Sequence, residues 1–125
     1  MPIGRSHGFR LACLERLQHR PTTYVYAIGD GGGAVKIGKS VGHPRERLAD
    51  LQTANPRPLT LLAWTQHLTE RQAHRLFWRW HLRGEWFALD AGLVARLRLW
   101  DWIDEPALTK CLRPAVAVRY NGTSR

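Results

Sequence analysis

The sequence predicts a single α/β domain, because extended apolar runs alternate along the chain with amphipathic helical patterns. Of its 125 residues, 44% are hydrophobic and 23% are charged, which is typical of a globular protein with one core. The N-terminus has no signal-peptide pattern, and no run of about 18 apolar residues that could span a membrane occurs. We therefore expect the protein in the cytoplasm.

The first elements are a helix and a hairpin. Apolar side chains in residues 8–19 follow a helical spacing that Pro21 ends, so residues 1–21 are predicted to form an N-terminal helical extension. Residues 24–28 and 34–37 are extended apolar runs. The turn sequence Asp-Gly-Gly-Gly between these two runs predicts that they pair as a β-hairpin.

A second helix and a third strand are expected after the hairpin. Pro44 fits the first turn of a helix, and Asn55 begins a Pro-rich stretch that ends it. This helix is predicted to expose Arg45 and Arg47. Residues 59–64 form another extended apolar run and are predicted to be the third strand.

Two further helices are predicted in the second half of the chain. Thr69 is a suitable N-cap, and Gly84 is expected to end the helix that it begins. That helix would turn four apolar side chains inward, at Ala73, Leu76, Phe77 and Trp80. Residues 85–89 are expected to be extended, and Pro106 should close off a last amphipathic helix. Its apolar stripe consists of Leu93, Val94, Leu97 and Trp100.

These elements predict one domain over residues 22–105, followed by a basic C-terminal extension over residues 106–125 that is loosely ordered from about Arg113. Cys13 and Cys111 lack any paired Cys-x-x-Cys spacing, so buried thiols are expected. The 19 Lys and Arg residues outnumber the ten Asp and Glu residues, which gives a net charge of +9. This balance favours a polyanion such as nucleic acid as partner, although basic side chains can also simply solvate a surface.

Four short segments together resemble a known family. They are Tyr24-Val25-Tyr26 with Lys36-Ile37-Gly38-Lys39-Ser40 on the hairpin, then residues 47–56, then Glu70 with His74 and Phe77, and finally Gly84-Glu85-Trp86-Phe87. In this order they resemble the GIY-YIG nuclease superfamily, in the branch named after a meiotically up-regulated gene and its phage relatives. The resemblance covers roughly residues 22 to 90.

The resemblance implies a compact α/β/α domain in which helices flank a small central, mostly antiparallel sheet. It also implies that a hairpin tyrosine, a helix arginine and a glutamate meet at one divalent ion, which by position would be Tyr26, Arg47 and Glu70. Phosphodiester hydrolysis needs a group that activates water, a cation for the phosphate and a metal that stabilises the leaving oxygen. A single carboxylate suits Mg²⁺ or Mn²⁺.

The second tyrosine of the superfamily is replaced here by Lys36. Three interpretations stay open: Tyr26 alone assists the water, Lys36 binds phosphate, or the domain binds nucleic acid without cleaving it. A lysine acts as a base only where burial or a neighbouring cation depresses its pKa.

Further candidates surround these residues. Lys39 and Arg45 could bind the substrate phosphate, or they could be ordinary surface charges. His74 follows Glu70 by four positions, so it could orient that carboxylate, protonate the leaving group or simply pack on the helix. Additional candidates for contacts with substrate or metal are Tyr24, His43 and Glu85.

The sequence thus predicts a divalent-metal-dependent endonuclease of low sequence specificity, acting on DNA in preference to RNA, with a partner protein as one source of specificity. The alternative is a non-catalytic nucleic-acid-binding module with the same fold. Six tryptophans are expected mostly to fill the core, and only an exposed pair such as Trp78 and Trp102 would suggest stacking on bases.

Overall fold

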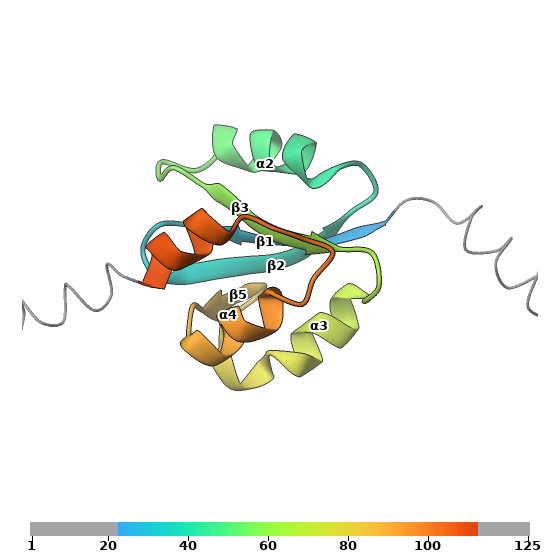
Figure 1. Ribbon diagram of the computed structural model, residues 1–125. Coiled ribbons are helices and arrows are strands. Elements are labelled where there is room, and N and C mark those ends of the chain that lie inside the picture. Colours follow the sequence, from blue (N-terminus) through green and yellow to red (C-terminus); the bar gives the residue numbers. More distant parts are fainter. Residues whose placement is uncertain (1–22, 113–125) are drawn as a thin grey trace, which may run out of the picture.

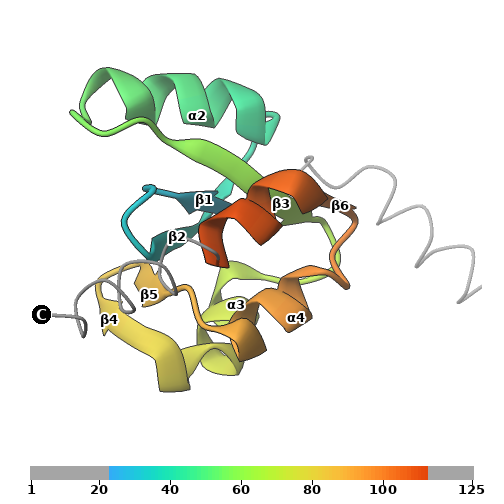
Figure 2. The same ribbon diagram turned by 60° about the vertical axis from the view of Figure 1, so that its left-hand side comes forward.

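The computed structural model describes residues 23–112, and Figures 1 and 2 show it from two directions. The helix expected within residues 8–19, Cys13 and the chain from Arg113 onward lie outside the described residues. The elements in chain order are β1 (Tyr24–Gly29), β2 (Ala34–Ser40), α2 (Pro44–Thr53), β3 (Thr60–Thr65), α3 (Glu70–Leu76), the short 3₁₀ helix η1 (Trp78–Trp80), β4 (His81–Arg83), β5 (Trp86–Ala88), α4 (Ala91–Leu97) and β6 (Trp102–Ile103). Residues 105–112 form a further helix. Within this part of the chain, no helix has the length and apolar character needed to cross a membrane.

All strands belong to one sheet in the order β4-β5-β2-β1-β3-β6, and every pairing is antiparallel. The predicted α/β class and the antiparallel sheet are therefore confirmed. The expected hairpin lies at the centre, where Tyr26 of β1 faces Gly38 of β2. Its turn is held by Asp30, whose Oδ1 accepts hydrogen bonds from the backbone N–H groups of Gly32 (2.7 Å) and Ala34 (3.2 Å).

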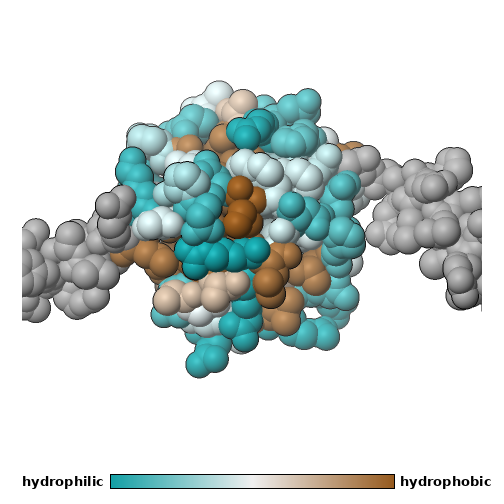
Figure 3. Space-filling view, in the orientation of Figure 1, coloured by the Kyte–Doolittle hydropathy of each residue, from teal (hydrophilic) through white to brown (hydrophobic). Residues whose placement is uncertain are grey.

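Helices cover both faces of the sheet (Figure 1). On one face, Leu48 and Leu51 of α2 pack against a small buried cluster of Tyr26, Ile28 and Leu61. On the other face, α3, α4 and the helix at residues 105–112 enclose the larger core cluster, whose bulkiest members are Phe77, Phe87, Leu93, Leu97 and Leu108. Figure 3 shows mostly hydrophilic side chains over α2, as expected for a helix that buries only one side.

The helix that begins after Thr69 is shorter than predicted. The capping signal is confirmed, since Thr69 Oγ1 accepts a hydrogen bond from the backbone of Gln72 (3.0 Å) and Gln72 Oε1 accepts one from the backbone of Thr69 (2.9 Å). However, α3 ends at Leu76 and not at Gly84, and Leu76 is 51% exposed and does not face inward. Both of those predictions are wrong.

The early end of α3 is caused by tertiary interactions. Phe77 is fully buried, and the chain turns through η1 immediately after it so that His81 of β4 can pair with Phe87 of β5. Gly84 lies in the turn between these strands with φ of 55°, in the left-handed region that favours glycine. The gain from pairing two strands and burying Phe77 outweighs a sequence that would otherwise continue as helix.

The end of the predicted last helix also differs. α4 stops at Leu97, and Pro106 does not close off a helix but lies in the first turn of the helix at residues 105–112, where its missing N–H is no loss. Leu108 of that helix is fully buried in the main core. The core therefore continues beyond residue 105, where the C-terminal extension was expected to begin.

The tryptophans fill the core only in part: Trp64, Trp80, Trp100 and Trp102 pack against the two buried clusters without being fully buried. None of the six is fully buried: five are partly buried, and Trp78 is 59% exposed. The largest buried side chains are Tyr26, Phe77 and Phe87. Trp102 does not form an exposed pair with Trp78, because the guanidinium of Arg45 lies 5.2 Å above the Trp102 ring.

Candidate active site

The site is built around Gly38 of β2. A Cβ atom at this position would lie 2.5 Å from the hydroxyl oxygen of Tyr26 and 3.0 Å from Oε1 of Glu85, so any other residue would push these groups apart. Tyr26 is buried, and its hydroxyl accepts a hydrogen bond from Arg47 of α2, which raises the pKa of that arginine. The absence of a side chain on Gly38 thus lets β1, α2 and the β5 segment converge.

Glu85 reaches this point because β5 leaves β2 there. The last paired residues are Lys36 and Trp86, and the backbone N–H of Ile37 then donates to the carbonyl of Glu85 at 2.8 Å. The ammonium of Lys36 lies 3.1 Å from Glu85 Oε1 and 5.7 Å from the centre of the Trp86 ring. Lys36 is therefore held against a carboxylate, an arrangement that positions Glu85.

The edge of β2 beyond Lys36 is covered by α3. His74 donates from Nε2 to the carbonyl of Ile37 at 2.7 Å, and its ring meets the edge of Phe87 at 5.0 Å. The same Nε2 is 3.9 Å from Glu70 Oε2, too far for a hydrogen bond. His74 thereby fastens the helix to the sheet and places Glu70, the first residue of α3, beside the β2 edge.

Two carboxylates meet at this edge. Partial burial and a hydrogen bond with Glu85 raise the pKa of Glu70, while His74 and Lys39 act in the opposite direction. Burial also opposes ionisation of Glu85, but hydrogen bonds from Glu70 and Lys36 lower its pKa below the usual value. The two carboxyl groups are therefore coupled, and their pKa values are pushed apart, that of Glu70 upward and that of Glu85 downward.

This pair fits a hard divalent cation, since an ion bound between the two carboxylates would offset the repulsion between their negative charges. Among residues 23–112, no group of three or more His, Cys, Asp or Glu side chains could hold an ion. The remaining ligands would come from water and substrate oxygens, as Mg²⁺ commonly prefers.

A shallow cavity of about 300 Å³ opens beside Arg47. It lies between the end of β2 and the start of α2, and it is lined by Lys39, Ser40, Val41, Gly42, His43, Glu46, Arg47 and Asp50. Lys39 and Arg47 contribute two cations to this lining, and Glu46 and Asp50 contribute two carboxylates; a phosphate group would bind at the two cations.

Three candidate residues are engaged in other contacts, although one of them, His43, also lines this cavity. Arg45 stacks on Trp102 and does not line the cavity. Tyr24 packs in a ring cluster with His43 and Trp64, with centroids 5.0 to 5.7 Å apart. His43 caps α2, because its Nδ1 accepts the backbone N–H of Arg45 at 3.1 Å. That bond places the proton of a neutral ring on Nε2, so neither nitrogen has a free lone pair with which to activate water.

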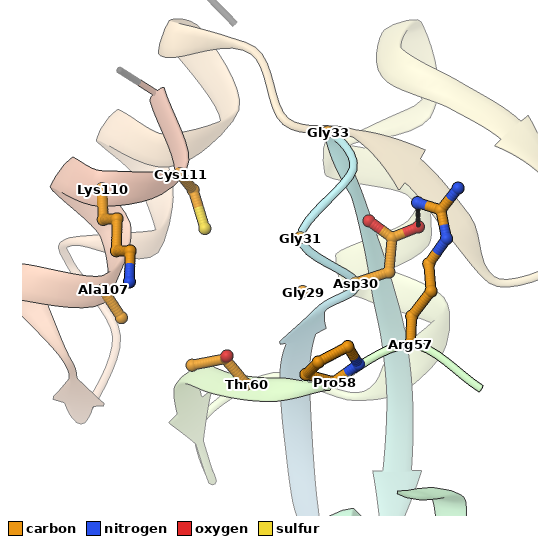
Figure 4. A pocket seen from close by; sticks show the side chains of 10 residues that line it. All are labelled: Gly29, Asp30, Gly31, Gly33, Arg57, Pro58, Thr60, Ala107, Lys110 and Cys111. Carbon is orange, nitrogen blue, oxygen red and sulfur yellow. Dashed lines mark ion pairs between the residues drawn. The ribbon is translucent and has the colours of Figure 1, made fainter. Parts of the chain in front are cut away.

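A second cavity, of about 530 Å³, lies at the other end of the hairpin and was not foreseen (Figure 4). Asp30 pairs with Arg57 at 3.8 Å on one side of it, and Lys110 and Cys111 of the C-terminal helix lie on the other. The Cys111 side chain is half-buried, and burial raises the pKa of its thiol, which disfavours a nucleophilic role.

Comparisons of the chain with protein-family models, with curated proteins and with solved structures gave no significant match.

Proposed function

We propose that the protein is a divalent-metal-dependent endonuclease that hydrolyses phosphodiester bonds of nucleic acid in the cytoplasm. The observation that carries this proposal is the convergence at Gly38 of the buried Tyr26 hydroxyl, which Arg47 contacts, with the carboxylate of Glu85, which is coupled to Glu70. The positions of Tyr26, Arg47 and Glu70 also match the resemblance to GIY-YIG nucleases, and the net charge of +9 suits a polyanion.

The residues on the α2 side of the site bind the phosphate and position the water in this proposal. Arg47 is solvent-exposed and already oriented by its bond to Tyr26, so its remaining N–H groups can hold phosphate oxygens in a two-pronged contact. Lys39, which lines the same cavity as Arg47, adds a mobile positive charge. The Tyr26 hydroxyl, between Arg47 and Glu85, positions the attacking water.

The residues on the α3 and β5 side hold the metal. Glu70 and Glu85 would bind one Mg²⁺ or Mn²⁺, which when bound supplies positive charge next to the leaving oxygen. Lys36 positions Glu85, and His74 positions Glu70 through the β2 backbone. In this proposal neither Lys36 nor His74 needs to transfer a proton.

The substrate is DNA in preference to RNA, and sequence specificity is low, because the elements at the site present backbone-binding cations and no set of side chains for reading base edges. A partner protein would supply any specificity beyond that.

Incubation of the purified protein with plasmid, single-stranded DNA and RNA, in Mg²⁺, Mn²⁺ or EDTA, tests the proposal. Cleavage should require the ion and disappear in the Glu70→Ala variant. Binding without cleavage in every condition would instead establish the non-catalytic module, and activity that survives Glu70→Ala would reveal a contaminant.

A further inference from the structure

An exposed aromatic stack stands next to the proposed site. The rings of Trp78 and His81 lie nearly parallel, with centroids 4.1 Å apart and an interplanar angle of 12°. Trp78 is 59% exposed, whereas the other five tryptophans are partly buried. One face of its indole is thus supported by an imidazole while much of the ring stays in contact with solvent.

The stack is held rigidly. His81 Nε2 donates to the carbonyl of Gly84 at 3.0 Å, and the His81 ring meets Phe87 edge to face at 5.2 Å. Phe87 is fully buried and pairs with His81 across the β4 and β5 strands. The His81 ring is fixed by a hydrogen bond, a strand pairing and a core contact. A base that stacks on Trp78 would therefore cost the protein little conformational entropy.

The stack is connected to the residues of the proposed site. Gly84, which His81 contacts, directly precedes Glu85. Phe87, which supports His81, also contacts the ring of His74 at 5.0 Å. Only the rings of His81 and Phe87 therefore separate Trp78 from the histidine that positions Glu70.

The surroundings of the stack are positively charged. Arginine occurs at every fourth position through this segment, at Arg71, Arg75, Arg79 and Arg83, and residues 71–83 contain no Asp or Glu. All four arginines are exposed, and within residues 23–112 none of them forms an ion pair. A flat aromatic ring among unpaired cations matches the two parts of a nucleotide, a base with a π face and an anionic phosphate.

We propose that the Trp78–His81 stack is a platform for an unpaired base, so that the substrate of the site carries single-stranded nucleic acid next to the scissile phosphate. This inference rests on the proposed function and narrows its substrate class. Inside a duplex both faces of each base are covered by neighbouring bases, so a duplex can meet the arginines but cannot stack on Trp78. Single strands, flaps and loops can do both.

The test is the binding of short fluorescent single strands to the full chain, measured by anisotropy in EDTA so that nothing is cleaved. Duplex binding is measured in the same assay with a covalently closed circular duplex as unlabelled competitor, because it has no end at which a base pair could stack. Trp78→Ala should weaken single-strand binding by about tenfold, the scale of one lost base stack, and leave duplex binding unchanged. Trp78→Phe should keep most of the affinity. Leu99→Ala, at an 84% exposed apolar position outside the segment, is the matched control and should change neither.

The outcomes separate this inference from the proposed function. Equal losses on single strand and duplex, or no loss on either, would overturn the platform. A change in oligomeric state in Trp78→Ala, seen by sedimentation, would assign the ring to contact with a second copy and also overturn it. If the parent protein binds single strands through Trp78 but cleaves nothing in Mg²⁺ or Mn²⁺, the platform stands and the nuclease proposal fails.

Discussion

Two regions of the molecule place a glutamate beside partners that differ in charge, in one case another carboxylate and in the other an arginine. At the β2 edge, Glu70 and Glu85 are brought together partly buried, and burial together with the neighbouring Glu85 raises the pKa of Glu70. After α4 in the sequence, the Glu105 carboxylate accepts hydrogen bonds from Nε (2.9 and 3.0 Å) and Nη2 (2.7 Å) of Arg98, with both side chains exposed. The pair of Arg98 and Glu105 has the better hydrogen-bond geometry, and its two charges are opposite.

The difference shows which of the two is a candidate for function. In an exposed ion pair the two charges attract each other, and water and salt screen most of that energy. Two carboxylates on different elements repel each other, and the folded state must hold them together with contacts elsewhere, here Lys36, His74 and Gly38. Such an unfavourable arrangement is typical of a site that binds a cation.

The largest effect is expected from Glu70→Gln. This change removes a metal ligand and should abolish cleavage, yet it also removes the repulsion with Glu85, so the free energy of unfolding in EDTA should rise, by less than about 2 kcal/mol. Nuclease assays and urea titrations of the same preparation measure both quantities.

Ligand binding gives an independent check of that prediction. Mn²⁺ or Mg²⁺ should raise the melting temperature of the parent protein and leave that of Glu70→Gln unchanged, because an ion that binds only the folded state stabilises it. A variant that loses activity and stability together would show that Glu70 is structural.

The next effect is expected at Arg47. Arg47→Ala should lower kcat by about 10²- to 10³-fold, the usual scale for the loss of one preorganised donor to the transition state. Arg47→Lys should recover little, since a point charge cannot both hold the Tyr26 hydroxyl and grip phosphate in two places. Single-turnover kinetics measure this, and a lysine variant as fast as the parent would show that the planar contact is unimportant.

A smaller effect is expected at Lys36, which distinguishes a base from a positioning residue. Lys36→Met should cost about 10- to 100-fold in rate, as for other residues that orient a metal ligand, and keep the pH profile of the parent. Tyr26→Phe should lower the maximal rate, because it removes the hydroxyl that orients water. A Lys36→Met protein without activity at saturating substrate and metal, beside a fully active Tyr26→Phe, would make Lys36 the base.

Local signals in the sequence were sufficient for part of the fold. The turn that begins at Asp30, the proline at position 44 and the cap at Thr69 each act within four residues, and the hairpin, α2 and the start of α3 follow from them. The short strands β4 and β6 could not be predicted in this way. These strands have only two or three residues each. They are extended because Phe87 pairs with His81 across the turn at Gly84, and because Ala63, far away in sequence, pairs with Ile103.

The candidate site likewise contains residues that could be predicted from the sequence and residues that could not. Tyr26, Arg47 and Glu70 could be named because they match short motifs by position. The partnership of Glu85 with Lys36 and Glu70 depends on where β5 leaves β2, which no local pattern encodes. Nor could sequence spacing show that the proline-flanking His43 would be occupied as a helix cap.

The pH dependence of stability follows from the directions of the two pKa shifts. The raised pKa of Glu70 means that the folded state holds this proton more tightly than the unfolded state, so stability should fall as the pH rises from 4.5 through the folded pKa of Glu70. The lowered pKa of Glu85 makes stability fall on the acid side, below 4.5. Urea titrations in EDTA should show the loss of stability above pH 4.5 in the parent protein and not in Glu70→Gln. An equal loss in both proteins would assign it to other titratable groups.

The smallest effect is expected from Glu105→Gln, at the exposed pair. The lowered pKa of Glu105, caused chiefly by its hydrogen bonds with Arg98, means that its contribution to stability is present above pH 4.5 and lost as the pH falls through the folded pKa. Because both side chains are exposed, salt should erase the difference in unfolding between Glu105→Gln and the parent, and cleavage should not change. The difference between Glu70→Gln and the parent should persist in the same salt, since that pair is partly buried and less screened. If salt erased both differences equally, the two regions would be electrostatically alike, and the case for a cation site at Glu70 and Glu85 would lose its main support.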